Sequence, residues 1–220
     1  MTNLVCPHGS NSLKPLYIKD SKEKEEILKE SQNLPKILLN SAAAANVVML
    51  GAGYFTPLSG FMGKNDALNV AKNMLTEEGL FWPIPILNLT TNLDANIKIG
   101  SEVALLDPNV DGNPVIAIQK IRSIEELTDD ELKEMTKNIF GTLDAKHPGV
   151  KNFMSLGKTI ISGEIKVLNY SYFPKEFPGT FATAQEIRDM LKNANWQKIV
   201  AFQTRNPMHR AHEELCKMAL

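Results

Sequence analysis

The last 23 residues, Lys198 to Leu220, constrain this chain more than any other stretch. Their short apolar run Ile199–Phe202 predicts a buried strand. The residues from His212 onward are mostly good helix formers and predict a helix. Pro207 suits the first turn of a helix, so we expect the helix to begin there. Strand, polar turn and helix in this order place a binding loop at the carboxyl end of a sheet strand.

The polar turn in this stretch collects groups that bind anions. A helix beginning at Pro207 would direct free N–H groups and a partial positive charge at the space above the strand. Arg205 adds a planar guanidinium, and Gln203 and Asn206 add neutral donors. His209 and His212 are three residues apart and so share a helix face. Together these residues predict a site for a polyanion.

The turn also resembles the motif of a known family. The run QTRNPMHRAHE is similar to the Q-x-R-N-P-x-H-x-x-H motif of ATP sulfurylases, which join ATP and sulfate into adenylyl sulfate and pyrophosphate, or run the reverse reaction. Further segments agree with the family in order and spacing: Pro7–Gly9, Gly53–Met62, Trp82–Ile86, His147–Val150 and Phe181–Trp196. Family members are longer and this chain ends within a predicted helix, so we expect an amino-terminal fragment that is inactive alone.

The chemistry of adenylyl sulfate formation assigns roles to these residues. Sulfate is already deprotonated at neutral pH, so the reaction requires positioning and charge stabilisation, and no general base. We expect Gln203 and Arg205 to bind sulfate. The expected catalytic residues are Thr204, Arg205, Asn206, His209 and His212, and the same five with Gln203 are expected to bind ATP.

The resemblance also relates the run HRAH to the H-x-G-H motif of nucleotidyltransferases, with Ala211 in place of the glycine. Mg²⁺ is expected to accompany ATP through the phosphates, with no dedicated protein metal site. A zinc site using the two histidines and Cys216 is the weaker alternative, because no fourth ligand lies nearby in the sequence. Another alternative is an H-x-G-H adenylyltransferase that acts on a small organic phosphate.

The rest of the chain predicts a β-rich domain of the α+β class followed by the start of an α/β domain. Strands are expected at 81–90, 102–106, 114–121 and 159–170, and helices after the caps Asp20 and Thr128. Few βαβ signals suggest a barrel-like amino-terminal domain, and the resemblance implies a PUA-like fold. We expect this domain at 1–170. A linker within 171–180 and the beginning of a Rossmann-like nucleotidyltransferase domain are expected at 171–220.

Two glycine-containing segments could suggest phosphate loops. The loop Gly51–Gly63 is interpreted as a structural turn anchored by aromatic residues. The run Gly157-Lys158-Thr159 resembles the end of a P-loop, but the earlier glycine is missing and a strand follows where a helix should. His147-Pro148-Gly149 is interpreted as a turn.

The net charge and the cysteine content indicate which partners and which compartment to expect. The 220 residues carry a net charge of −1, and the only two cysteines, Cys6 and Cys216, lie near opposite ends. We therefore expect no nucleic-acid or membrane partner and a reducing, cytoplasmic location. No leader-like start and no apolar run of ~20 residues is seen. An RNA-binding PUA-like module is the remaining alternative, and the lack of a basic stripe disfavours it. The full-length enzyme is expected to be a homo-oligomer.

Overall fold

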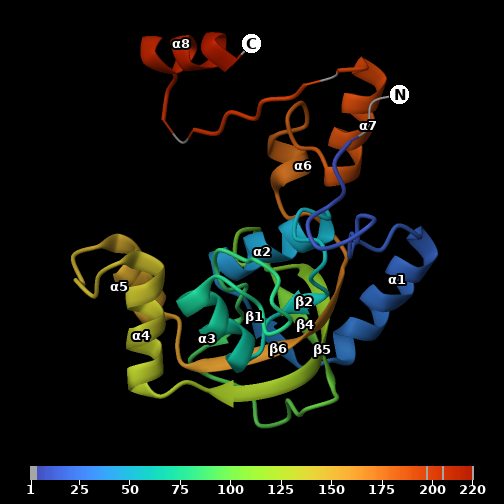
Figure 1. Ribbon diagram of the computed structural model, residues 1–220. Helices are drawn as coiled ribbons and strands as arrows, with labels where there is room; N and C mark the ends of the chain where they lie inside the picture. The colour runs from blue at the N-terminus through green and yellow to red at the C-terminus, as the bar shows by residue number, and fades with distance from the viewer. Residues whose placement is uncertain (1–3, 197, 205, 220) are drawn as a thin grey trace. The chain divides into compact units, whose positions relative to one another are not determined.

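The computed structural model describes residues 4–196, 198–204 and 206–219 (Figure 1). Contacts divide the chain into two compact units. The larger unit is Cys6–Gln185, and the smaller unit contains Glu186–Leu220 together with the first five residues.

A mixed sheet of six strands forms the centre of the larger unit. The strands are β1 (Lys36–Leu38), β2 (Gly60–Phe61), β3 (Leu89–Thr90), β4 (Glu102–Leu106), β5 (Val115–Glu126) and β6 (Thr159–Val167). Their order is β1-β4-β5-β6-β2, and β3 also pairs with β6. Strands β1 and β4 are parallel, and the other pairs are antiparallel. In the described residues this pairing is an open path, because β1 and β2 at its two ends do not pair, so the sheet does not form the closed ring of a barrel.

The hairpin of β4 and β5 agrees with the sequence prediction, but β5 is longer than expected. It continues to Glu126 because the pairing with β6 resumes after a register shift between Ile121 and Ser123. Such a bulge increases the local twist of a strand. Figure 1 shows β5 and β6 as the two long curved strands of the unit.

Six helices precede residue 184 in the described part of the chain. They are α1 (Ser21–Glu30), α2 (Ser41–Gly51), α3 (Lys64–Asn73), α4 (Asp129–Phe140), α5 (Pro148–Ser155) and α6 (Phe173–Glu176), with a 3₁₀ turn at Ser31–Asn33. Of these, α1, α2, α4 and α5 begin with a side-chain cap. The caps predicted at Asp20 and Thr128 are confirmed, since each side chain accepts the N–H three residues on. Gly141 ends α4 in the left-handed region, where glycine is favoured.

The main core lies between α2 and the strands β5 and β6. Helix α2 presents the buried side chains of Ala43, Ala44, Val47 and Val48, and these small residues allow close packing. A second apolar cluster joins α3 and α4 to Leu87, Leu89 and Ile160. Two buried amide side chains of the core are paired: Asn88 donates to Gln119, which donates to the carbonyl of Ile161.

The glycines of the loop Gly51–Gly63 serve packing, in agreement with the structural interpretation. A Cβ at Gly60 would lie 2.0 Å from the carbonyl oxygen of Gly163 on β6. A Cβ at Gly51 would lie 2.7 Å from the side chain of Val167. Both distances are too short for a real Cβ. The lack of a side chain therefore lets the backbone of β6 approach Gly60 and the Val167 side chain approach Gly51.

Three further segments differ from the sequence prediction, and one of them is β6, which ends at Val167 instead of residue 170. Only Leu89–Thr90 of the expected strand 81–90 is a strand, because Pro83 and Pro85 have no N–H to donate to a neighbour. The expected turn at His147 is the start of α5. There the ring Nδ1 of His147 accepts the N–H of Val150, and Pro148 occupies the first helical turn.

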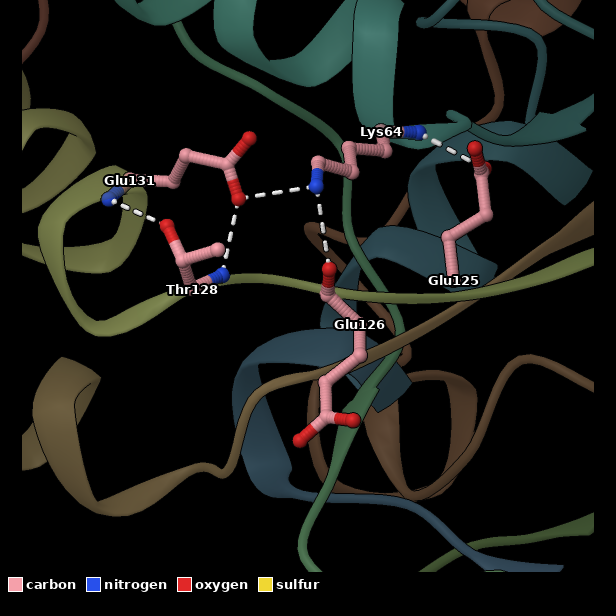
Figure 2. A network of polar contacts seen from close by, with 5 residues as sticks. All are labelled: Lys64, Glu125, Glu126, Thr128 and Glu131. Carbon is pink, nitrogen blue, oxygen red and sulfur yellow. Dashed lines mark hydrogen bonds and ion pairs between the residues drawn. The ribbon is translucent and has the colours of Figure 1, made fainter.

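A network of polar contacts joins the starts of α3 and α4 to the end of β5 (Figure 2). The backbone N–H of Lys64 donates to Glu125, and its ammonium contacts Glu131 and the carbonyl of Glu126. Glu131 also closes a capping box with Thr128. The hydrogen bond from the Lys64 N–H, followed by one from the Ser123 hydroxyl, lowers the pKa of Glu125. The network therefore fixes both helix starts against the sheet.

The segment expected to be a linker packs against the larger unit. It contains α6, and Phe173 and Phe181 contact the main core with ring centroids 6.1 Å apart. Helix α7 (Ala184–Ala194) begins after this segment. The N–H of its first residue, Ala184, donates to the carbonyl of Ala52, just after α2. The larger unit therefore extends to Gln185.

Candidate active site

The residues predicted to bind ATP and sulfate lie in the smaller unit, before and within α8 (Arg210–Ala219). The helix begins three residues later than predicted, at Arg210 instead of Pro207. Backbone N–H groups of His212 and Glu213 donate to the carbonyl of His209, which marks His209 as the residue before the first turn. Pro207 therefore belongs to the polar turn and not to the helix.

The predicted buried strand Ile199–Phe202 is wrong for this structure. These residues have no helix or strand assignment, and Ile199, Val200 and Phe202 are 46%, 63% and 38% exposed. A strand is held by hydrogen bonds to a neighbouring strand. Among the described residues of the smaller unit there is no such neighbour, so local propensity alone does not form a strand.

The two predicted histidines do lie together. Their ring centroids are 3.8 Å apart with an interplanar angle of 31°. The Nδ1 of His212 accepts the backbone N–H of His209 at 3.4 Å. The ring of Phe202 packs against His212 at 5.5 Å and 58°. Phe202 was not among the predicted site residues; its position next to Gln203, where the apolar run meets the polar turn, is the signal that could have found it.

The polar turn brings Thr204 and Asn206 together. The Thr204 hydroxyl donates to the carbonyl of Asn206 and accepts the N–H of the same residue. Gln203 is exposed, as are Thr204 and Asn206, so their side chains are accessible to a ligand. Arg205, the predicted sulfate-binding guanidinium, lies outside the described residues.

Charged groups in α8 pair along the helix. Hydrogen bonds to Glu213 and then to Glu214 raise the pKa of Lys217. In the described part of the chain, no three His, Cys, Asp or Glu side chains are placed to hold a metal ion. The zinc alternative with Cys216 therefore gains no support. The side chains of the described turn are amide, hydroxyl and imidazole groups, which can donate hydrogen bonds to an anion.

A hollow of the larger unit contains other polar side chains. It has a volume of about 660 Å³, and loop Pro57–Asp66 lines much of it. Lys14, Arg122, Glu77 and Glu78 line it, as does Lys64, which is paired with Glu131. Acidic groups outnumber basic ones, because Asp66 and Glu125 also line the hollow, and it contains none of the predicted site residues. We place the candidate site in the smaller unit because the motif, and not the size of a cavity, defines the chemistry.

No helix in the described ranges combines the length and the apolar character needed to cross a membrane.

Two family models match successive parts of the chain. Residues 5–170 match the family model for a PUA-like domain, and residues 179–220 match the family model described as ATP-sulfurylase. The chain is therefore of the class in which a PUA-like domain is followed by an ATP-sulfurylase segment.

Curated relatives agree along the whole chain. "Sulfate adenylyltransferase" of Alcanivorax borkumensis is 52% identical over all of this chain and 54% of the relative. The proteins of the same name from Allochromatium vinosum and the Riftia pachyptila sulfur-oxidizing endosymbiont are 51% and 46% identical over 99% of this chain, which covers 54% and 49% of their lengths. Over residues 5–170 the chain belongs to the PUA-like domain family, and along its whole length it is similar to sulfate adenylyltransferases. It spans about half the length of these relatives.

One solved structure, "Hexameric APS kinase from Thiobacillus denitrificans", matches the fold with a TM-score of 0.75. The match covers 99% of this chain and 37% of the other at 24% identity. It therefore supports the fold only.

Proposed function

We propose that the full-length protein is a sulfate adenylyltransferase, which converts ATP and sulfate into adenylyl sulfate and pyrophosphate or catalyses the reverse reaction. The observation that carries this proposal is the run Gln203–His212. It lies in a chain that is 52% and 51% identical, over 100% and 99% of its length, to two relatives of that name. This activity would place the protein in sulfate assimilation or in another branch of sulfur metabolism.

The reaction forms a bond between a sulfate oxygen and the α-phosphorus of ATP while the bond from that phosphorus to the pyrophosphate oxygen breaks. No proton has to be removed from sulfate. The protein must hold two anions in contact and stabilise the charge that develops on the α-phosphate and on the leaving group. Neutral and cationic donors fixed at one turn perform this task well.

The residues of the turn divide this work. Gln203 and Arg205 bind sulfate, and Arg205 also reaches the α-phosphate. Thr204 and Asn206 donate to α-phosphate oxygens, and the exposure of both side chains supports this role. The Thr204 hydroxyl would exchange its hydrogen bond to the Asn206 carbonyl for one to the phosphate. These residues bind ATP together with the histidine pair.

His209 and His212 stabilise the departing phosphates. Their rings lie 3.8 Å apart at the start of α8, where the helix dipole also favours negative charge.

Mg²⁺ would enter on the phosphate oxygens of ATP. The described residues contain no cluster of three side chains suited to a metal, so they do not fit a dedicated Mg²⁺ site. No step of this proposal passes through the ion.

We further propose that residues 1–170 form the PUA-like domain and that 171–220 hold a linker and the beginning of a Rossmann-like nucleotidyltransferase domain. The match of residues 179–220 to the family model described as ATP-sulfurylase supports a separate segment after the PUA-like domain. A cytoplasmic homo-oligomer is proposed for the full-length protein.

Pyrophosphate release from ATP plus sulfate tests the proposal. In the full-length protein, we expect Arg205→Ala to lower kcat by about 10²- to 10³-fold, the usual cost of removing one donor to a developing anion. Lys192→Ala is a matched control, because Lys192 is an exposed cation on α7 outside the proposed site. Equal activity of the two variants would remove Arg205 from the site, and no sulfate-dependent release by the unaltered protein would refute the function itself.

A further inference from the structure

The hydrogen bond between the two histidines determines which nitrogen of His212 can act on a ligand. His209 occupies the cap position of α8, and His212 is the third residue of the helix. The Nδ1 of His212 accepts the N–H of His209. This is the reciprocal half of a capping box, with histidine in the position usually held by Glu or Gln.

A ring nitrogen that accepts an N–H cannot itself carry a hydrogen. A neutral imidazole with Nδ1 in this role therefore has its hydrogen on Nε2. His212 is half-buried, which limits its access to water. Its ring is in contact with that of His209, with centroids 3.8 Å apart. The hydrogen bond at Nδ1 thus leaves Nε2 as the nitrogen that can present a hydrogen to a ligand.

Phe202 fixes the orientation of this donor. Its ring meets His212 at 5.5 Å and 58°, a tilted aromatic contact that restricts rotation of the imidazole. Phe202 is the last residue of the apolar run, so the contact joins the segment before the polar turn to the helix after it.

We propose that His212 acts as a neutral Nε2–H donor to a phosphate oxygen of the nucleotide, with Nδ1 held by the backbone of His209, and that Phe202 is a positioning residue for it. The inference rests on the proposed adenylyl transfer for the identity of the anion. The tautomer and the role of Phe202 in fixing it are properties of the 220-residue chain alone.

The first test is ¹⁵N NMR of the 220-residue chain near neutral pH, with the His212 signals assigned by their loss in His212→Gln. We expect an unprotonated Nδ1 and a protonated Nε2. We expect Phe202→Leu to shift the signals towards an averaged pair of tautomers and Phe202→Tyr to preserve the pattern. A protonated Nδ1, or averaged signals in the unaltered chain, would overturn the inference whatever the activity of the enzyme.

The second test uses the full-length enzyme and measures kcat and KM for ATP and sulfate. Glutamine can accept the His209 N–H with its oxygen and donate with its amide, so we expect His212→Gln to stay within about tenfold of the unaltered kcat. His212→Ala should lose about 10²- to 10³-fold. If Gln is as inactive as Ala, His212 works through a charge that glutamine lacks, and the neutral-donor assignment is overturned.

The role of Phe202 has its own prediction in the same assay. Phe202→Leu should lower kcat by about 10- to 100-fold with KM nearly unchanged, because small misplacements of a reacting group cost rates of this order. Phe202→Tyr should restore kcat. Equal loss in both variants, or a change confined to KM, would overturn the positioning role. If the unaltered full-length protein shows no adenylyl transfer, the proposed function and the phosphate ligand fail, while the NMR result still decides the tautomer and its dependence on Phe202.

Discussion

Replacement of Gly60 by alanine tests whether the glycine-containing loop before α3 is structural. The added Cβ would lie 2.0 Å from the carbonyl oxygen of Gly163, 2.9 Å from its carbonyl carbon and 3.0 Å from the Cα of Glu164. All three neighbours are backbone atoms of β6, which cannot rotate away as a side chain can. The short strand β2 would have to move from β6 by at least about 1 Å to reach an ordinary contact.

The expected magnitude follows from two contributions. Forcing an extra carbon into a packed site costs about 1–3 kcal/mol. Moving β2 also weakens the backbone hydrogen bonds beside it, such as Ile165 N–H to the carbonyl of Ser59, at about 1 kcal/mol each. We therefore expect Gly60→Ala to lower the free energy of unfolding by about 2–4 kcal/mol, a large part of the usual 5–15 kcal/mol.

Urea unfolding followed by tryptophan fluorescence measures this effect, since Trp82 is buried in the core of the larger unit. Gly179→Ala is the matched control: no atom lies within 4 Å of its added Cβ, and its φ is outside the left-handed region. We expect the control to change the free energy of unfolding by less than about 0.5 kcal/mol. A Gly60→Ala variant as stable as the control would refute the packing role and reopen a ligand role for the loop.

Three further predictions concern the polar network and the isolated chain. The pKa of Glu125 is lowered in the folded state, so its ionised form stabilises the fold fully above the unfolded pKa of about 4.5, and this contribution is lost as pH falls through the folded value. Glu125→Gln should therefore make the free energy of unfolding less dependent on pH in that range. Thr128→Ala should destabilise the protein by about 1 kcal/mol in thermal unfolding while Thr128→Ser, which keeps the cap, should not; equal losses would contradict a capping role. The 220-residue chain alone should release no pyrophosphate and show no salt-dependent RNA binding, and turnover by it would contradict the need for further residues.

Local signals in the sequence determined much of the helical structure and the chemistry of the candidate site. Asp20 and Thr128 cap their helices through hydrogen bonds that span three residues, and Gly141 supplies a left-handed ending. Such features involve only neighbours along the chain, so they can be predicted without a fold. The donor-rich turn around Asn206 and the pairing of His209 with His212 are of the same kind.

The tertiary structure decided what depends on distant partners. Strand β1 exists because it pairs with Ala104–Leu106 of β4, nearly 70 residues away, and nothing in its three residues requires this. Gly60 is needed because β6 lies against it. The apolar run Ile199–Phe202 shows the converse, since strand propensity without a neighbouring strand leaves the backbone without its ladder of hydrogen bonds. Capping is a property of a few consecutive residues, whereas a sheet is a property of segments brought together, and only the folded chain determines which segments meet.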